Sequence, residues 1–325
     1  MAVDELTDVL SPVSRDLTAV SKRLMSCLKE PVAKKVVYLV AAGGKRLRPA
    51  LVLLCGAAGP LPNRQALIDT AAAVELIHTA TLIHDDIIDE ALVRRSQPSF
   101  HSRWGTERAV LMGDYLYASA FTLLAGLQTP YVMRVMSDVC RQLCRGELLE
   151  VEARFRVDLT EREYFEIIAD KTASLIGGCC RAGAHLGGCS KESIARFEQF
   201  GVNFGIAFQI IDDCLDLVGD QTRLGKTILT DLDKGALSLP IIYLAKQLSP
   251  RARKALFAPL RTRATDPVYL RRLATEARNA GAIAKAQARA AALIDEARGA
   301  VSALQLNGLQ SAYEQLARYA VLRER

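Results

Sequence analysis

The stretch Ile83–Arg95 reads IHDDIIDEALVRR and ends in two adjacent arginines. It carries a triplet of aspartates, Asp85, Asp86 and Asp89, inside a run that otherwise suits a helix. Residues four apart lie one above the other on a helix, so Asp85 and Asp89 project from one face and repel each other by roughly 0.2–0.5 kcal/mol. A positive partner is therefore expected there, either an arginine or a divalent cation, unless the face is simply solvated.

A second triplet repeats this spacing near the end of another long apolar run. Asp212, Asp213 and Asp216 lie in FQIIDDCLDLVGD at 208–220. One such triplet alone is typical of a solvated helix face, but two triplets flanked by Ile, Leu and Val are costly to bury unless they are neutralised. Six carboxylates facing one cavity would hold several Mg²⁺ ions, which prefer oxygen ligands and bridge carboxylates to substrate phosphates.

Composition limits the possible classes of function. The chain has 325 residues, of which 50% are hydrophobic and 24% charged, as in an ordinary globular protein. Its net charge of +6 suits anionic small molecules and falls short of the basic stripe of a nucleic-acid binder, so we expect no nucleic acid as a partner. The acidic N-terminus does not resemble a secretory signal, and no apolar run reaches the roughly 18–20 residues that span a bilayer. We therefore expect a cytoplasmic protein.

The cysteines and glycines do not form a recognisable site. Eight cysteines are scattered along the chain, and Cys140 and Cys144 have no matching His or Cys pair that would complete a zinc site. They are more typical of small buried hydrophobic residues. The segment AAGGKRLRP at 41–49 lacks the spacing and the Ser or Thr of a P-loop, so it is not a Walker A motif.

Helical periodicity dominates the chain, and alternating strand patterns are almost absent. The run at 65–95 contains no Gly or Pro and predicts one long helix. Short Gly, Pro and Ser breaks separate further runs, which is typical of connections inside one bundle. We therefore predict an all-α fold, a single-domain antiparallel bundle over residues 1–325 with a central cavity. The other expected helices are Glu107–Gly126, Pro130–Phe155, Glu161–Leu186, Lys191–Val218, Leu237–Leu248, Val268–Ala303 and Gly308–Arg325.

Six short segments stand out in order along the chain: GGKRLRP, ELIHTATLIHDDIIDEALVRR, GDYLYASAF, DKTASLI, FQIIDDCLD and LGKTILTDL. Together they resemble the motifs of the trans-polyprenyl diphosphate synthases, which are aspartate-rich, all-α prenyltransferases. The resemblance runs from about Gly43 to Pro240. It implies the isoprenoid synthase type of bundle, with the family's two DDxxD motifs at Asp85–Asp89 and Asp212–Asp216.

The resemblance also implies a reaction. An allylic diphosphate, such as farnesyl or geranylgeranyl diphosphate, loses pyrophosphate; isopentenyl diphosphate attacks the resulting cation, and the departing pyrophosphate takes the proton. About three Mg²⁺ ions on the two triplets would stabilise the leaving diphosphate. The implied catalytic residues are Asp85, Asp89, Arg94, Lys171, Asp212 and Lys226. The implied contacts to the allylic diphosphate are Arg94, Lys171, Thr172, Gln209 and Lys226.

A separate basic pocket is implied for isopentenyl diphosphate. It would consist of Lys45, Arg48, His78 and Arg95, because guanidinium groups suit phosphate oxygens. From the residues alone, Lys45 and Arg48 could equally be surface charges at the start of a helix, and His78 could be a hydrogen-bonded core histidine. The other three histidines are expected to be structural.

One departure from the family pattern concerns a lysine. After the second triplet the family often carries a GKxTLP-like segment, whereas DKGALSLP here has Ala236 at the lysine position and Lys234 two residues earlier. Loss of one charge-assisted contact would cost on the order of 1.5–3 kcal/mol, which would slow catalysis without abolishing it. The departure also keeps open a non-catalytic subunit of a heteromeric synthase.

Product length is expected to depend on the helix that leads into the first triplet. In the family the growing chain runs along this helix, and a bulky aromatic residue there stops it early. Here Ala80, Thr81 and Ile77 are not aromatic, and the path from Asp85 to Ala73 is roughly 18 Å. The resemblance therefore implies a long product of the heptaprenyl, octaprenyl or solanesyl type, similar to the precursors of quinone side chains.

The sequence also leaves alternative functions and several partners to consider. A class I terpene cyclase shares the helical bundle but would not need the GGKRLRP pocket, and a shorter-chain synthase is a further alternative. We expect a homodimer that pairs through Ala109–Gly126, with Gly113, Ala118 and Ala120 allowing close approach. The lipid product could bring the protein into transient contact with a membrane.

Overall fold

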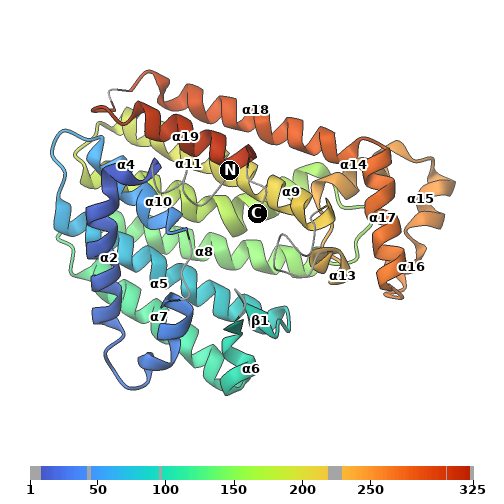
Figure 1. Ribbon diagram of the computed structural model, residues 1–325, viewed down its shortest axis with the longest axis horizontal. Helices are drawn as coiled ribbons and strands as arrows, with labels where there is room; N and C mark the ends of the chain where they lie inside the picture. The colour runs from blue at the N-terminus through green and yellow to red at the C-terminus, as the bar shows by residue number, and fades with distance from the viewer. Residues whose placement is uncertain (1–8, 42–44, 95–96, 219–228, 305, 323–325) are drawn as a thin grey trace.

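The computed structural model describes residues 9–41, 45–94, 97–218, 229–304 and 306–322 (Figure 1). In these ranges the chain is almost entirely helical. Its α-helices are α2 (Ser14–Cys27), α3 (Val37–Ala41), α4 (Leu47–Ala57), α5 (Arg64–Ile88), α6 (Phe100–Trp104), α7 (Thr106–Ala125), α8 (Pro130–Ala153), α9 (Glu161–Ile168), α10 (Ser174–Leu186), α11 (Lys191–Val218), α13 (Thr230–Asp233), α14 (Leu239–Gln247), α15 (Pro250–Leu256), α16 (Ala258–Arg261), α17 (Pro267–Asn279), α18 (Ala282–Ser302) and α19 (Gln310–Leu322).

The remaining regular elements are short. Two 3₁₀ turns, η1 (Ser11–Val13) and η2 (Ala33–Val36), flank α2, and the π-helical turn η3 (Ala169–Ala173) joins α9 to α10. The strands β1 (Val93–Arg94) and β2 (Gln97–Pro98) form an antiparallel pair. Only this pair interrupts the all-α architecture in the described part of the chain, so the predicted fold class is confirmed.

The long helices pack side by side through the centre of the molecule. Figure 1 shows α8, α10 and α11 next to one another, with α18 along one edge, and α10 also contacts α4. Glycines allow two of these close approaches: a Cβ on Gly183 of α10 would collide with the backbone of Val52 in α4, and Gly201 of α11 lies against Gly177 of α10. Small residues thus bring these helices near enough to enclose one apolar core.

The helix expected over 65–95 ends earlier than predicted, because α5 stops at Ile88. Directly after the capping residue Asp89, Glu90 has a left-handed backbone with a φ of 51°. Negative side chains at the C-terminal end of a helix oppose its dipole, which favours a break here. Arg94 consequently lies in β1 and not on the helix.

Other boundaries also differ from the sequence-based expectation. The run at Glu161–Leu186 is helical throughout but contains the π turn η3. The run at Val268–Ala303 is two helices, α17 and α18, because Gly281 takes a φ of 68° between them. Helices α2, α3, α6, α13, α15 and α16 were not expected, and α4 was considered only as a helix that starts near Lys45 and Arg48. The predictions for the other long helices agree with the structure to within a few residues.

Helix α5 is long and apolar enough, by length and composition, to cross a membrane. The expectation that no run of this kind exists was therefore wrong. However, 78% of its apolar window is buried inside the fold, which is typical of a core helix. Its contacts with α2, α4, α7 and α10 account for this burial.

Helix α7 was expected to use small residues for pairing with a second copy. The structure corrects this detail, because Gly113 lies against the His84 ring and Ala120 is fully buried, so both pack within their own chain. Ala118 remains exposed, as does the side chain of Leu111, which is 67% exposed. An outward apolar surface is thus still present on α7, but large side chains contribute to it.

The glycine contact between α10 and α4 leads to a paired prediction. Gly183→Ala should lower the free energy of unfolding by about 1–3 kcal/mol, because the added methyl collides with the Val52 carbonyl. Gly299→Ala in α18, where nothing lies within 4 Å of the added methyl, should raise it by up to about 1 kcal/mol through helix propensity. Urea unfolding followed by circular dichroism measures both. Equal stability of the two variants would contradict the close approach of α10 and α4.

Candidate active site

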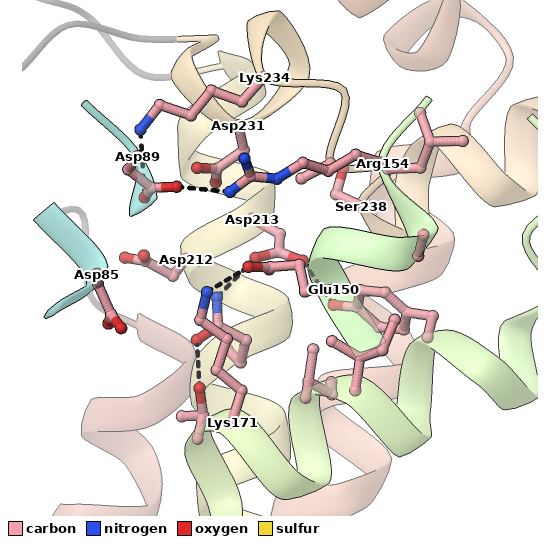
Figure 2. A pocket seen from close by; sticks show the side chains of 18 of the residues that line it. Asp85, Asp89, Glu150, Arg154, Lys171, Asp212, Asp213, Asp231, Lys234 and Ser238 are labelled. Atoms are coloured by element: carbon pink, nitrogen blue, oxygen red, sulfur yellow. Dashed lines mark hydrogen bonds and ion pairs between the residues drawn. The ribbon is translucent and has the colours of Figure 1, made fainter. Parts of the chain in front are cut away.

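One cavity collects most of the residues singled out by the sequence. It lies between the ends of α5, α8 and α11, the π turn η3 and the segment around α13. Figure 2 shows acidic side chains from α5 and α11 facing each other across it. Its polar lining consists of Asp85, Asp89, Arg94, Glu150, Arg154, Tyr164, Lys171, Thr172, Gln209, Asp212, Asp213, Asp231, Lys234 and Ser238.

The first triplet is split between the cavity and the protein behind it. Asp85, in the last turn of α5, lines the cavity, and burial, followed by the nearby Glu147 carboxylate, raises its pKa to about 7. Asp89 also lines the cavity. Asp86 is fully buried outside the lining and accepts hydrogen bonds from Arg94 Nε at 2.8 Å and Nη2 at 2.5 Å.

The second triplet is divided in the same way. Asp212 and Asp213 line the cavity, whereas Asp216 is buried behind it and accepts a hydrogen bond from Thr230 Oγ1 at 3.3 Å. Both oxygens of Asp213 are engaged, because Tyr164 Oη donates at 2.6 Å and Gln209 Nε2 at 2.8 Å. Burial, followed by Asp231, raises the pKa of Asp213 well above its usual range.

The expectation of six carboxylates around one cavity therefore needs correction. Four of them line it, and Asp86 and Asp216 stand behind. The reason is local: on each helix end the second or third aspartate points toward a donor of the protein, either Arg94 or Thr230. Their role as metal ligands stays a prediction.

The lysine of the π turn lies among carboxylates. Lys171 Nζ is 2.7 Å from Glu147 Oε2 and also pairs with Glu150. Burial alone would lower the pKa of Lys171, but Glu150, Glu147 and Asp85 outweigh it, so the pKa is raised and the ammonium stays charged. Gly146 of α8 lies against the backbone of Lys171, which lets the turn approach the cavity. Turns of this π type often occur at functional sites.

The neighbouring polar residues form a chain of hydrogen bonds. Thr172 Oγ1 donates to Gln209 Oε1 at 2.9 Å, and Gln209 in turn donates to Asp213. Thr172 and Gln209 thus line the cavity as predicted, and their hydrogen-bond partners in this structure are side chains of the protein.

Two further residues expected at the site, Lys226 and Arg95, lie outside the described residues.

The donor chemistry of the cavity fits divalent cations, although no site is assembled. Among the described residues, no group of three or more metal-binding side chains is close enough together to hold an ion. Burial nevertheless raises the pKa of Asp85, so a bound cation would favour its charged form, and Asp86 Oδ2 is buried without a hydrogen-bond partner. Carboxylate oxygens are the ligands that Mg²⁺ prefers. The residues that could hold such ions here are Asp85, Asp89, Asp212 and Asp213.

A second, smaller pocket contains the residues expected to bind isopentenyl diphosphate. Lys45, Arg48 and His78 line it together, with Arg48 Nη1 3.2 Å from His78 Nε2. Arg48 is half-buried, whereas Lys45 is exposed and lies over the Tyr319 ring. The structure thus brings these three side chains into one pocket, and their role as diphosphate ligands stays a prediction.

The residues expected to control product length lie on α5, close in sequence to His78 of the smaller basic pocket. Ala80 and Ile77 are fully buried, and Thr81 is half-buried. None of the three lines the central cavity. Their assignment to a product tunnel therefore remains a prediction.

Several site residues were missed by sequence reasoning. Glu147 and Glu150 lie on α8 and Arg154 caps its end. Tyr164 and Asp231 also line the cavity. The spacing of GELLEVEAR places Glu147, Glu150 and Arg154 near one face of a helix, which is a signal that could have been used. Asp231 offered no comparable pattern.

An all-α bundle with carboxylates and several cations in one cavity is suited to a class of protein that binds polyanionic substrates with the help of divalent metal ions. The chain belongs to the polyprenyl synthetase family, whose profile matches residues 29–276. It is therefore a prenyl diphosphate synthase, which is a prenyltransferase. The family uses isopentenyl diphosphate and allylic diphosphates as substrates and depends on divalent metal ions. The resemblance and the enzyme class predicted from the motifs are confirmed.

Known relatives differ in product length. The chain is 39% identical, over 71% of its length and 72% of the relative's, to the short chain isoprenyl diphosphate synthase of Methanothermobacter thermautotrophicus. It is 32% identical, over 97% and 98%, to heptaprenyl diphosphate synthase component 2 of Geobacillus stearothermophilus. Among solved structures, the polyprenyl synthase of Caulobacter crescentus, complexed with calcium and isoprenyl diphosphate, matches with a TM-score of 0.93, 30% identity and coverage of 100% and 98%.

The pairing of Asp86 with Arg94 predicts energetic coupling between them. Asp86→Asn and Arg94→Gln should each destabilise the metal-free protein, and the double variant should lose less than the sum by at least about 0.5 kcal/mol, since both remove one buried contact. Urea unfolding in the presence of chelator measures this cycle. Additive losses would mean that Asp86 does not depend on Arg94, and a direct metal role for Asp86 would become the better explanation.

Proposed function

We propose that this prenyl diphosphate synthase makes a long-chain product. It would add isopentenyl diphosphate repeatedly to farnesyl or geranylgeranyl diphosphate, giving roughly C35 to C45 chains for use in quinone side chains. The stretch of α5 from Asp85 to Ala73, roughly 18 Å long, gives room for several isoprene units. The observation that carries this proposal is the row of non-aromatic residues Ala80, Thr81 and Ile77 on α5 before the first triplet. The near full-length match to a heptaprenyl synthase component supports it.

In this proposal the central cavity receives the allylic diphosphate. Arg94, Lys171 and Thr172 lie in its wall, where their donors can reach phosphate oxygens, and Gln209 fixes the position of Thr172. About three Mg²⁺ ions on the aspartates would draw off the charge that develops on the leaving diphosphate. Lys226 would add a further cation from the segment outside the described residues.

The smaller basic pocket would receive isopentenyl diphosphate. Lys45 and Arg48 supply positive charge there, and His78 supports the Arg48 guanidinium from α5. Arg95 would join this group. Because His78 and Asp85 lie two turns apart on the same helix, α5 would hold the two substrates at a set separation.

The proposal also covers assembly and location. A homodimer formed through the outward surface of α7 would cover Val110 and Leu111, which are 41% and 67% exposed. We propose a cytoplasmic location, with transient membrane contact when the lipid product leaves.

Two alternatives keep specific support. A shorter-chain synthase is favoured by the match to a short chain enzyme at the higher identity. A non-catalytic subunit is favoured by Ala236, which stands where the family often has lysine, and the name of one relative contains the words component 2. Against the latter, Asp85, Asp89, Asp212 and Lys171 all line one cavity.

A product assay tests the proposed function. Purified protein with isopentenyl diphosphate, farnesyl diphosphate and Mg²⁺ should make products of roughly C35 to C45, lose activity with chelator, and sediment as a dimer. Asp85→Ala and Asp212→Ala should each lower turnover by roughly two orders of magnitude or more, because each removes oxygen ligands at the developing charge. Products that stop at C20 would favour the shorter-chain alternative, and an inert protein would favour the non-catalytic subunit.

Chain length itself can be tested on α5. Ala80→Tyr should shorten the main product to about fifteen or twenty carbons, because an aromatic ring one turn from Asp85 would block elongation, while the first condensation continues. Chromatography of the dephosphorylated products measures this. If Ala80 instead packs only against a neighbouring helix, tyrosine should cost roughly 1–3 kcal/mol of stability and leave product length unchanged. A folded, active variant with the same long product would remove the main support for the long-chain proposal.

A further inference from the structure

Asp89 is held by two cations that come from distant parts of the chain. Arg154 Nη2 lies 2.8 Å from Asp89 Oδ1, and Lys234 Nζ lies 3.2 Å from Asp89 Oδ2, as the dashed lines in Figure 2 show. The three side chains are between 21% and 30% exposed, so they are accessible from the cavity. Each carboxylate oxygen of Asp89 thus has a cation of the protein beside it.

The backbone places these two cations next to each other. Arg154 is the capping residue at the end of α8, and the amide of the next residue, Phe155, donates to the Gly235 carbonyl at 2.8 Å. Gly235 has a φ of 79°, and a side chain there would collide with the Phe155 ring. The residues that flank this contact, Arg154 and Lys234, are therefore delivered together to one side of the cavity.

The other cations of the cavity already have carboxylate partners. Lys171 pairs with Glu147 and Glu150, and Arg94 pairs with Asp86, which does not line the cavity. Glu150 also lines the cavity, but it lies on α8 outside the two aspartate triplets. Arg154 and Lys234 differ from the other cations because their shared partner, Asp89, belongs to the first triplet and lines the cavity with Asp85, as an oxygen ligand suited to a divalent cation.

We propose that Arg154 and Lys234 are exchangeable counter-ions of Asp89. They neutralise its carboxylate while no metal is bound, and they turn to the diphosphate when a divalent cation takes the carboxylate. Lys234 thereby supplies positive charge in the cavity wall where Ala236 has none. The inference rests on the proposed use of this cavity as the diphosphate site.

The exchange follows from charge competition. A divalent cation on Asp89 repels an ammonium and a guanidinium group a few ångströms away, and these groups then need another anion. Oxygens of a bound diphosphate would be the anion within reach. The exchange therefore predicts opposite effects of one substitution: without Lys234, metal binds more easily and diphosphate binds less tightly.

Two binding measurements on the full-length protein test this. Lys234→Gln should tighten Mn²⁺ binding in the absence of diphosphate by roughly two- to fivefold, since a partly exposed competing pair is removed, as followed by the electron paramagnetic resonance signal of free Mn²⁺. With saturating Mg²⁺, the same variant should bind inorganic pyrophosphate at least roughly tenfold more weakly in calorimetry, because a charge-assisted contact is lost.

Matched variants make the test specific. Lys246→Gln removes an ammonium that pairs with Glu161 at 3.0 Å outside the cavity lining, and it should leave both affinities unchanged. Lys234→Arg should keep both close to wild type. The double variant Lys234→Gln with Arg154→Gln should show a larger gain in Mn²⁺ affinity and a larger loss of pyrophosphate affinity than Lys234→Gln. It also tests whether Arg154 by itself can replace Lys234.

The outcomes separate this inference from the proposed function. If wild type binds pyrophosphate with Mg²⁺ but the double variant changes neither affinity, or weakens both, the exchange is wrong and the proposed function stands. If wild type does not bind pyrophosphate with Mg²⁺, both are overturned. Opposite shifts in the Lys234→Gln and double variants, with Lys246→Gln unchanged, support the exchange.

Discussion

Carboxylate charge at the ends of two core helices is the constraint on which the rest of this structure depends. Burial raises the pKa of Asp85, at the end of α5, to about 7, and it raises the pKa of Asp213, near the end of α11, well above its usual range. Such groups are stable only when protonated or close to positive charge and donors. Apolar packing brings the two helix ends together but does not stabilise the charge of these carboxylates. Cations or hydrogen-bond donors must therefore lie beside them.

Side chains of the protein neutralise the carboxylates that neighbour Asp85. Lys171 pairs with two glutamates of α8, Arg94 with Asp86, and Arg154 with Asp89, and each pair joins different elements. These contacts hold the ends of α5, α8 and η3 around the cavity. Lys171, Arg94 and Arg154 are also cations that a diphosphate would need. The stability of the ligand-free protein and its affinity for a diphosphate would therefore depend on the same side chains. The dependence of the family on divalent metal ions is consistent with this arrangement, because in the proposed exchange an added cation would release cations of the protein for the diphosphate.

Sequence reasoning predicted the helices well where periodicity was long and less well at their ends. The stop of α5 at Ile88 came from backbone geometry at Glu90 and from charge at the helix terminus, neither of which periodicity measures. The π turn at Lys171 depends on the space that Gly146 leaves in α8, a contact between separate helices. The assignment of Gly113 to a dimer surface failed for the same reason, since its small size serves His84 of its own chain.

The sequence by itself determined the class of this protein. The apolar period specifies helices, and the repeated spacing of aspartates with six ordered motifs specifies the family. Only the tertiary structure decided which carboxylates line the cavity and which cation each one meets. The physical reason is distance along the chain: helical spacing tells which side chains share a face, but Asp89 meets Arg154 from 65 residues away and Asp213 meets Tyr164 from 49 residues away. Such partners are selected by the packing of whole helices, which no local pattern records.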